Sequence, residues 1–128
     1  MTRRTAPPSG MAPPTEADGV DLVELAAEVI RRYAAARPEE AAEYEPGVWE
    51  AWGRHDNQHL LNWAIGDARH GLVDLVEQAR WLAGVLEARD YPRERLAFDL
   101  RLAADVVDER LGDDTVVARL RAAAAAVA

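Results

Sequence analysis

The chain has 128 residues, with 23 acidic and 15 basic side chains and a formal net charge of -8. This length suits one domain, and the acidic excess argues against a nucleic-acid-binding module, because such modules need a basic face to displace counterions. The chain has no cysteine, which excludes disulfides and thiolate metal sites. No apolar run approaches the ~20 residues of a membrane span, and the N-terminal residues lack the apolar stretch of a signal peptide. We therefore expect a cytoplasmic protein that contacts neither a membrane nor nucleic acid.

The first 19 residues contain four of the seven prolines and almost no large apolar side chain. Such a segment cannot bury enough apolar surface to offset the entropy lost when it becomes ordered. The composition predicts a disordered tail over residues 1–19 and a single domain over residues 20–128.

From Val20 onward, apolar residues recur at three- and four-residue spacing, which is typical of amphipathic helices. Pro38 either closes the first helix or opens a short acidic turn. Further helices are expected over about Val48–Arg69, Leu72–Ala88 and Arg93–Leu111, followed by an alanine-rich helix from Val116. We expect this last helix to be weakly anchored, because most of its apolar side chains are small.

No segment alternates polar and apolar residues with period two, and no Asp-Gly or Asn-Gly turn separates β-branched runs. The prediction is an all-α fold, an antiparallel bundle of four or five helices joined by short loops.

The second predicted helix carries the chemically informative residues. At 100° per residue, one of its faces holds aromatic, acidic and imidazole side chains together. The members of this face are Trp49, Trp52, Asp56, His59, Leu60, Trp63, Asp67 and His70. Two interpretations stay open: the face is core, with its polar groups paired to residues of other helices such as Arg80 and Arg101, or it lines a pocket. In the second case Trp52, Asp56, His59, Trp63 and Asp67 would bind a flat organic ligand.

His55 and His59 have the i, i+4 spacing of a helical zinc motif, with aspartate in place of the usual glutamate. Such a site needs at least a third protein ligand, which another helix would have to supply. We favour a histidine pair without metal and keep the metal site as the alternative.

The stretch from His59 to Gly112 contains an aromatic-rich helix, the run Trp-Leu-Ala-Gly-Val-Leu at 81–86, the loop Arg-Asp-Tyr-Pro at 89–92 and a leucine-striped helix. It resembles the helical domain that precedes the vitamin B12-binding domain of bacterial cobalamin-dependent regulators. The resemblance implies a helical module of a regulatory protein, a sensor or a docking unit.

The cofactor motifs of that family are absent. Its cobalamin-capping tryptophan is followed ten residues later by Glu-His, whereas Trp52 is followed at that distance by Asn62-Trp63. Its lower-ligand motif Asp-x-His-x-x-Gly is missing, because Asp67 and His70 have a different spacing. We therefore expect no cofactor, and a module without the cofactor domain that follows in that family.

The leading hypothesis is a small helical module that acts through protein contacts or a small ligand in an aromatic pocket. The alternative is a small acid-base or metal-dependent enzyme that uses Asp56, His59 and Asp67, since lysine is absent and the one serine lies in the predicted tail. We assign no catalytic residue. A symmetric homodimer is also predicted, because the third helix has a wider apolar face than a core stripe needs. That face comprises Leu75, Trp81, Leu82, Val85 and Leu86.

Overall fold

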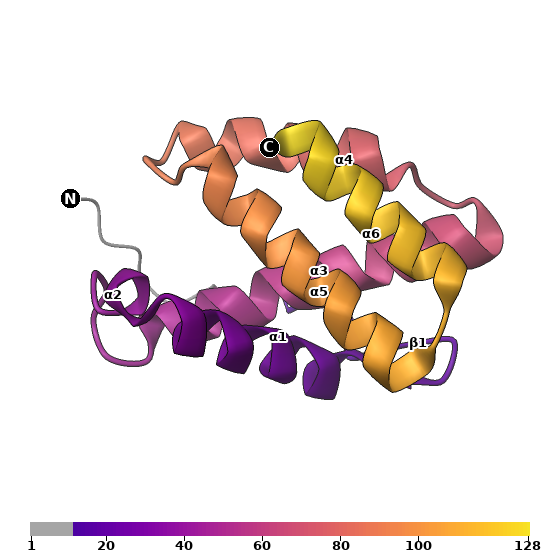
Figure 1. The fold of residues 1–128 in the computed structure, drawn as a ribbon, viewed down its shortest axis with the longest axis horizontal. Helices are drawn as coiled ribbons and strands as arrows, with labels where there is room; N and C mark the ends of the chain where they lie inside the picture. The colour runs from indigo at the N-terminus through magenta and orange to yellow at the C-terminus, as the bar shows by residue number, and fades with distance from the viewer. Residues whose placement is uncertain (1–11) are drawn as a thin grey trace.

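The computed structural model describes residues 12–128. Its elements are β1 (Glu16–Ala17), β2 (Val20–Asp21), α1 (Leu22–Ala36), α2 (Pro38–Ala41), α3 (Val48–His70), α4 (Leu75–Glu87), α5 (Arg93–Leu111) and α6 (Asp114–Val127). The long helices reverse direction one after another, as Figure 1 shows. The predicted all-α bundle is confirmed; α2 is a single turn beside the five long helices.

Short polar residues and glycines set the helix ends. Asp21, Asp74 and Asp113 each accept a hydrogen bond from the backbone N–H three residues later, which caps α1, α4 and α6. Gly71 and Gly112 follow α3 and α5 with φ of +61°, the left-handed conformation that ends a helix and that glycine adopts without strain. These signals explain why the predicted bounds of α3 and α5 agree with the structure within a residue.

The core gathers apolar side chains from all five long helices, and α6 is central to it. α6 packs against α3, α4 and α5, and α5 also packs against α1 (Figure 1). Leu120 and Ala123 of α6 are fully buried. The expectation that this helix is weakly anchored is therefore wrong: its alanines allow the neighbouring helices to approach closely on several sides.

Residues 12–19 differ from the predicted tail. β1 and β2 pair as a two-stranded antiparallel hairpin, turned by Asp18 and Gly19 at φ of +50° and +79°. The carbonyl of Pro14 accepts a hydrogen bond from Gln58 Nε2 at 3.0 Å, which ties this segment to α3. The Asp-Gly turn is a strong hairpin signal, but strands of two residues leave no alternating pattern to read. Residues 1–11 of the predicted tail lie outside the described residues.

Within residues 12–128, no helix is both long enough and apolar enough to span a bilayer.

Candidate functional site

A groove of about 580 Å³ runs between α3 and α4. This volume lies within the range of small-molecule sites in proteins. Side chains of both helices line the groove. We call this feature the α3–α4 groove; its lining residues are Trp52, His55, Asp56, His59, Trp63, Trp81, Leu82, Val85, Leu86 and Arg89.

Rings of α3 form a ladder along one wall of the groove. The centroid of the Trp52 ring lies 5.4 Å from that of His55, and the His55 centroid lies 4.9 Å from that of His59. His59 continues to Trp63 at 5.9 Å. The spacing of three and four residues places successive rings on adjacent turns of one face. This wall therefore presents a row of aromatic rings, set edge to face or tilted against one another, to whatever enters.

His59 adds little positive charge to the ladder. Burial lowers the pKa of His59 below its ordinary value, and the neighbouring His55 lowers it further. His59 is therefore mainly neutral at pH 7. Nδ1 of His55 lies 3.1 Å from Oδ1 of Asp56, so the carboxylate of Asp56 has a partner on its own helix. The two arginines considered as partners of Asp56 lie elsewhere: Arg80 pairs with Glu77, and Arg101 with Glu94.

Four of the five predicted ligand-binding residues line the groove together: Trp52, Asp56, His59 and Trp63. Asp67 does not. Its Oδ2 accepts a hydrogen bond from the backbone N–H of Leu75 at 2.9 Å, and its Oδ1 accepts one from Nε of Arg119 at 3.2 Å. Asp67 lies one turn beyond Trp63, the last groove residue of α3, and caps the start of α4, which a helical wheel of α3 alone cannot show.

His55 and His59 lie close enough to contact each other. Among residues 12–128, however, no group of three or more acidic or imidazole side chains is placed to hold a metal ion. The third ligand that the metal alternative needs is thus missing from the described part of the chain.

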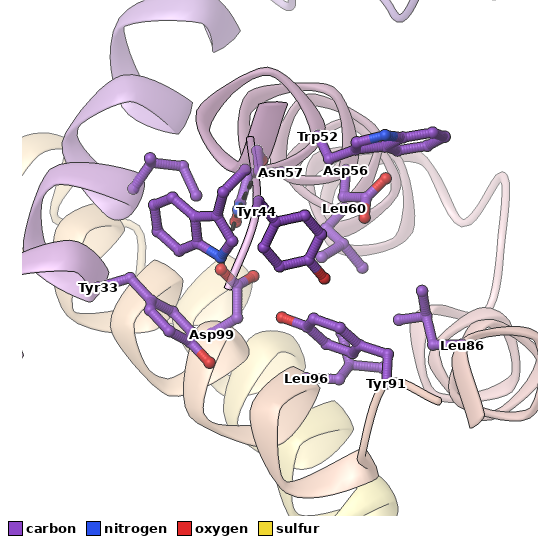
Figure 2. A pocket seen from close by; sticks show the side chains of 13 residues that line it. Tyr33, Tyr44, Trp52, Asp56, Asn57, Leu60, Leu86, Tyr91, Leu96 and Asp99 are labelled. Atoms are coloured by element: carbon purple, nitrogen blue, oxygen red, sulfur yellow. Dashed lines mark hydrogen bonds between the residues drawn. The ribbon is translucent and has the colours of Figure 1, made fainter. Parts of the chain in front are cut away.

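A second, smaller cavity lies beside the groove, between α1, α3 and α5 (Figure 2). Its volume is about 30 Å³, and Trp52, Asp56 and Leu86 line both this cavity and the groove. Five aromatic rings surround it, and we call them the aromatic cage. They belong to Tyr33, Tyr44, Trp49, Trp52 and Tyr91.

Asn57 and Asp99 are the buried polar residues of this cavity, 1% and 7% exposed. Nδ2 of Asn57 donates a hydrogen bond to Oδ1 of Asp99 at 2.9 Å. Oδ1 of Asn57 accepts no hydrogen bond from any residue of the described range, and no cationic side chain of that range pairs with Asp99. Burial raises the pKa of Asp99 to about 7 from 3.8; the hydrogen bond from Asn57 opposes the rise, and the charge of Asp56 adds to it.

Sequence reasoning missed Asn57, Asp99 and the three tyrosines. One signal for Asp99 exists in the sequence: it interrupts the apolar stripe of α5, one residue before the buried Leu100. Tyr33, Tyr44 and Tyr91 come from α1 and from two loops, so only the folded arrangement brings them together.

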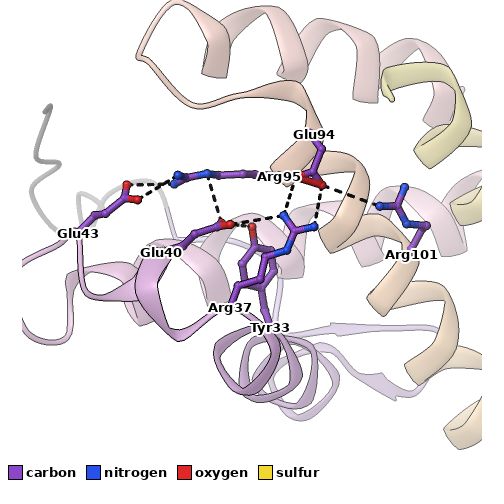
Figure 3. A network of polar contacts seen from close by, with 7 residues as sticks. All are labelled: Tyr33, Arg37, Glu40, Glu43, Glu94, Arg95 and Arg101. Carbon is purple, nitrogen blue, oxygen red and sulfur yellow. Dashed lines mark hydrogen bonds and ion pairs between the residues drawn. The ribbon is translucent and has the colours of Figure 1, made fainter.

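A charged network ties α1 and α2 to α5 at the edge of the cage (Figure 3). The hydroxyl of Tyr33 donates a hydrogen bond of 2.5 Å to Oε1 of Glu40, and Nε of Arg95 lies 3.3 Å from the same oxygen. Arg37 donates to both carboxylate oxygens of Glu94, at 2.7 and 2.8 Å. Burial raises the pKa of Tyr33 above its ordinary value, so its hydroxyl stays protonated and donates to Glu40. The network fixes one ring of the cage in place.

No known protein family matches the sequence, and no curated protein or solved structure matches it significantly. The resemblance to the helical domain of cobalamin-dependent regulators therefore stays a prediction.

Proposed function

We propose that the protein is a small cytoplasmic sensor module that binds a planar, mostly apolar molecule in the α3–α4 groove. The observation that carries this proposal is the groove itself: about 580 Å³ lined by three tryptophans, two histidines and three aliphatic side chains. Indole rings provide large apolar contact surfaces with little conformational freedom to lose on binding. The absence of cysteine, and hence of disulfides, is compatible with a reducing compartment.

Exposure of tryptophan supports a binding role over a purely structural one. The Trp81 side chain is 61% exposed on the groove, although a large ring is normally buried where it only fills a core. Arg89, on the same groove, forms no ion pair with any residue of the described range, unlike most arginines of this chain. An apolar ring system with an acidic substituent fits this combination.

The alternative of an acid-base or metal-dependent enzyme has less support. Of the three residues proposed for such an enzyme, Asp56 and His59 line the groove. Asp67 instead accepts a hydrogen bond from the backbone N–H of Leu75 at the start of α4. The resemblance to a regulatory helical domain agrees with a sensor, which changes its contacts when a ligand binds.

The test uses 8-anilinonaphthalene-1-sulfonate, a planar apolar probe with one anionic group. Fluorescence titration of the full chain should show saturable binding at one site, with energy transfer from tryptophan. Trp63→Ala and Trp81→Ala should each weaken binding about tenfold, the loss of one stacked ring.

Leu72→Ala is the matched control, because Leu72 is 76% exposed but does not line the groove. It removes an exposed apolar side chain and should leave the probe's affinity unchanged. Equal effects of Leu72→Ala and Trp81→Ala, or binding without saturation, would contradict the proposal.

The predicted homodimer stays a prediction and concerns the same helix. Leu75 and Leu86 of α4 turn into the core, and Leu82 and Val85 are half-buried, so Trp81 is the exposed remainder of the predicted face. A second copy bound there would cover the groove. Light scattering at tens of micromolar should therefore be measured with and without the probe, and a monomer in both would count against the dimer.

A further inference from the structure

The cavity inside the aromatic cage is lined by a buried hydrogen-bond acceptor that no residue of the described chain satisfies. Oδ1 of Asn57 is buried and accepts no hydrogen bond from residues 12–128. Asp99 is 7% exposed and accepts a hydrogen bond from Asn57. Asp56, which pairs with His55, is a second carboxylate on the lining. A buried acceptor without a donor destabilises the folded state, so the cavity calls for a donor from outside the chain.

The rings around these acceptors favour a cation over a neutral donor. The faces of tyrosine and tryptophan rings carry negative potential and attract ammonium groups, most strongly where water is excluded. In Figure 2 the side chains of Tyr44 and Tyr91 point toward one another across the space next to Asp99. Carboxylates and ring faces together repel an anion.

We propose that the aromatic cage binds a small alkylammonium ion, whose N–H groups donate to Asp99 and Oδ1 of Asn57 while its carbon contacts the rings. The volume of the cavity agrees with an ion of this size. One water molecule needs roughly 10–15 Å³ by the same measure, so a cavity of about 30 Å³ holds a group of about two non-hydrogen atoms. Methylammonium is such a group.

The aromatic cage adjoins the α3–α4 groove, the site of the proposed function. Trp52, Asp56 and Leu86 line both the cage and the α3–α4 groove. A primary amine on an apolar ligand would enter the cage while the rest of the ligand lies in the groove. The occupancy of the cage by an ammonium ion does not depend on this extension, because all the acceptors it needs belong to the cage.

The test is a proton NMR titration of the full chain with methylammonium chloride at about pH 8, where Asp99 is ionised, and at constant ionic strength, followed by the methyl resonance of the ligand. An ion enclosed by five rings should show a saturable upfield shift. The binding energy available to two non-hydrogen atoms sets Kd at about 10 mM or weaker, so the titration extends to about 100 mM.

Asp99→Asn removes the buried charge but keeps an acceptor for Asn57, and it should weaken methylammonium binding at least about tenfold. Asp105→Asn is the matched control, because it makes the same change on an exposed carboxylate of the same helix, paired with Arg121; it should bind as the unmodified chain does. Trp52→Leu is a second variant, which removes one ring without touching the acceptors and should reduce the upfield shift.

Three results would overturn the proposal: no saturable shift in the unmodified chain, equal binding by Asp99→Asn, or displacement of methylammonium by an equal concentration of potassium chloride. Either of the first two results would indicate that water occupies the cavity. Displacement by potassium would indicate a site for metal cations. None of them depends on the naphthalene probe, so failure of the cage and failure of the groove are distinguishable.

Discussion

Asn57 and Asp99 join α3 to α5 in the middle of the bundle through one hydrogen bond of 2.9 Å. The same Nδ2 of Asn57 donates to the carbonyl of Gly53 at 2.9 Å, which fixes the orientation of the amide. Both donor hydrogens of the amide are thereby used, and its oxygen has no donor among residues 12–128. The pair thus acts as a buried polar contact within the bundle and as one wall of the aromatic cage.

Asp99 makes the stability of the protein depend on pH. Its pKa is about 7 in the folded state against 3.8 for the free side chain, so the folded state binds a proton more tightly than the unfolded one. The contribution of Asp99 to the free energy of unfolding has its full value below about pH 4 and is lost as the pH rises through about 7. Between pH 5 and pH 8 the free energy of unfolding should fall by about 2 to 3 kcal/mol through Asp99 alone.

Urea unfolding of the unmodified chain and of Asp99→Asn, at pH 5 and at pH 8, checks this. The variant cannot ionise at this position, so the difference in stability between the two proteins should move in favour of Asp99→Asn at pH 8. A difference that is the same at both pH values would show that Asp99 is ionised throughout, with a pKa near its ordinary value.

Close approach of α1 and α3 depends on Gly53. A Cβ atom at this position would lie 2.3 Å from Cδ1 and 2.9 Å from Cγ1 of Ile30, which is itself buried against the rings of the cage. Gly53→Ala should therefore destabilise the protein by about 1–3 kcal/mol, the usual effect of overpacking. It should also displace Ile30 and alter the cage.

Gly84 offers the matched control. It lies inside α4, and a Cβ there would meet nothing within 4 Å. Gly84→Ala should stabilise the protein by about 0.5–1 kcal/mol, because alanine loses less conformational freedom in a helix than glycine. The unfolding temperature should fall in Gly53→Ala and rise in Gly84→Ala. A shift of the same sign in both variants would contradict the packing assigned to Gly53.

The sequence predicts the helices well and the site only in part. Pro92 and Gly112 bound α5 at the predicted residues, because both signals are local. The α3 wall of the groove is also local, since the ring ladder follows from residue spacing within one helix. Asp67 and Asp99 were misjudged or missed because their partners are distant along the chain: Arg119 lies 52 residues from Asp67, and Asn57 lies 42 residues from Asp99.

α6 shows why composition alone misleads. Its alanines suggest weak packing, but burial in a helix depends on how closely neighbouring helices approach, and small side chains permit close approach on several faces. Leu120 is fully buried between such neighbours. Leu120→Ala should cost about 2–5 kcal/mol, as for other buried leucines.

Hydrogen exchange provides an independent check on α6. Its central amides should be protected to the same degree as those of α5, since both helices would exchange only through global unfolding. Protection of α5 with fast exchange throughout α6 would restore the original expectation of a weakly anchored end.

Asp67 has a structural role that is separate from the binding role assigned to the groove. Its carboxylate accepts from the N–H of Leu75, which begins α4, and its side chain is 15% exposed. Asp67→Ala should cost about 1–3 kcal/mol, because it leaves that N–H without an acceptor. Asp67→Asn keeps an oxygen for the N–H and loses the half-exposed ion pair with Arg119, so it should cost less than about 1 kcal/mol. Urea unfolding measures both, and neither variant should change the affinity for 8-anilinonaphthalene-1-sulfonate. A tenfold loss of probe binding in Asp67→Asn, with unchanged stability, would return Asp67 to the binding site.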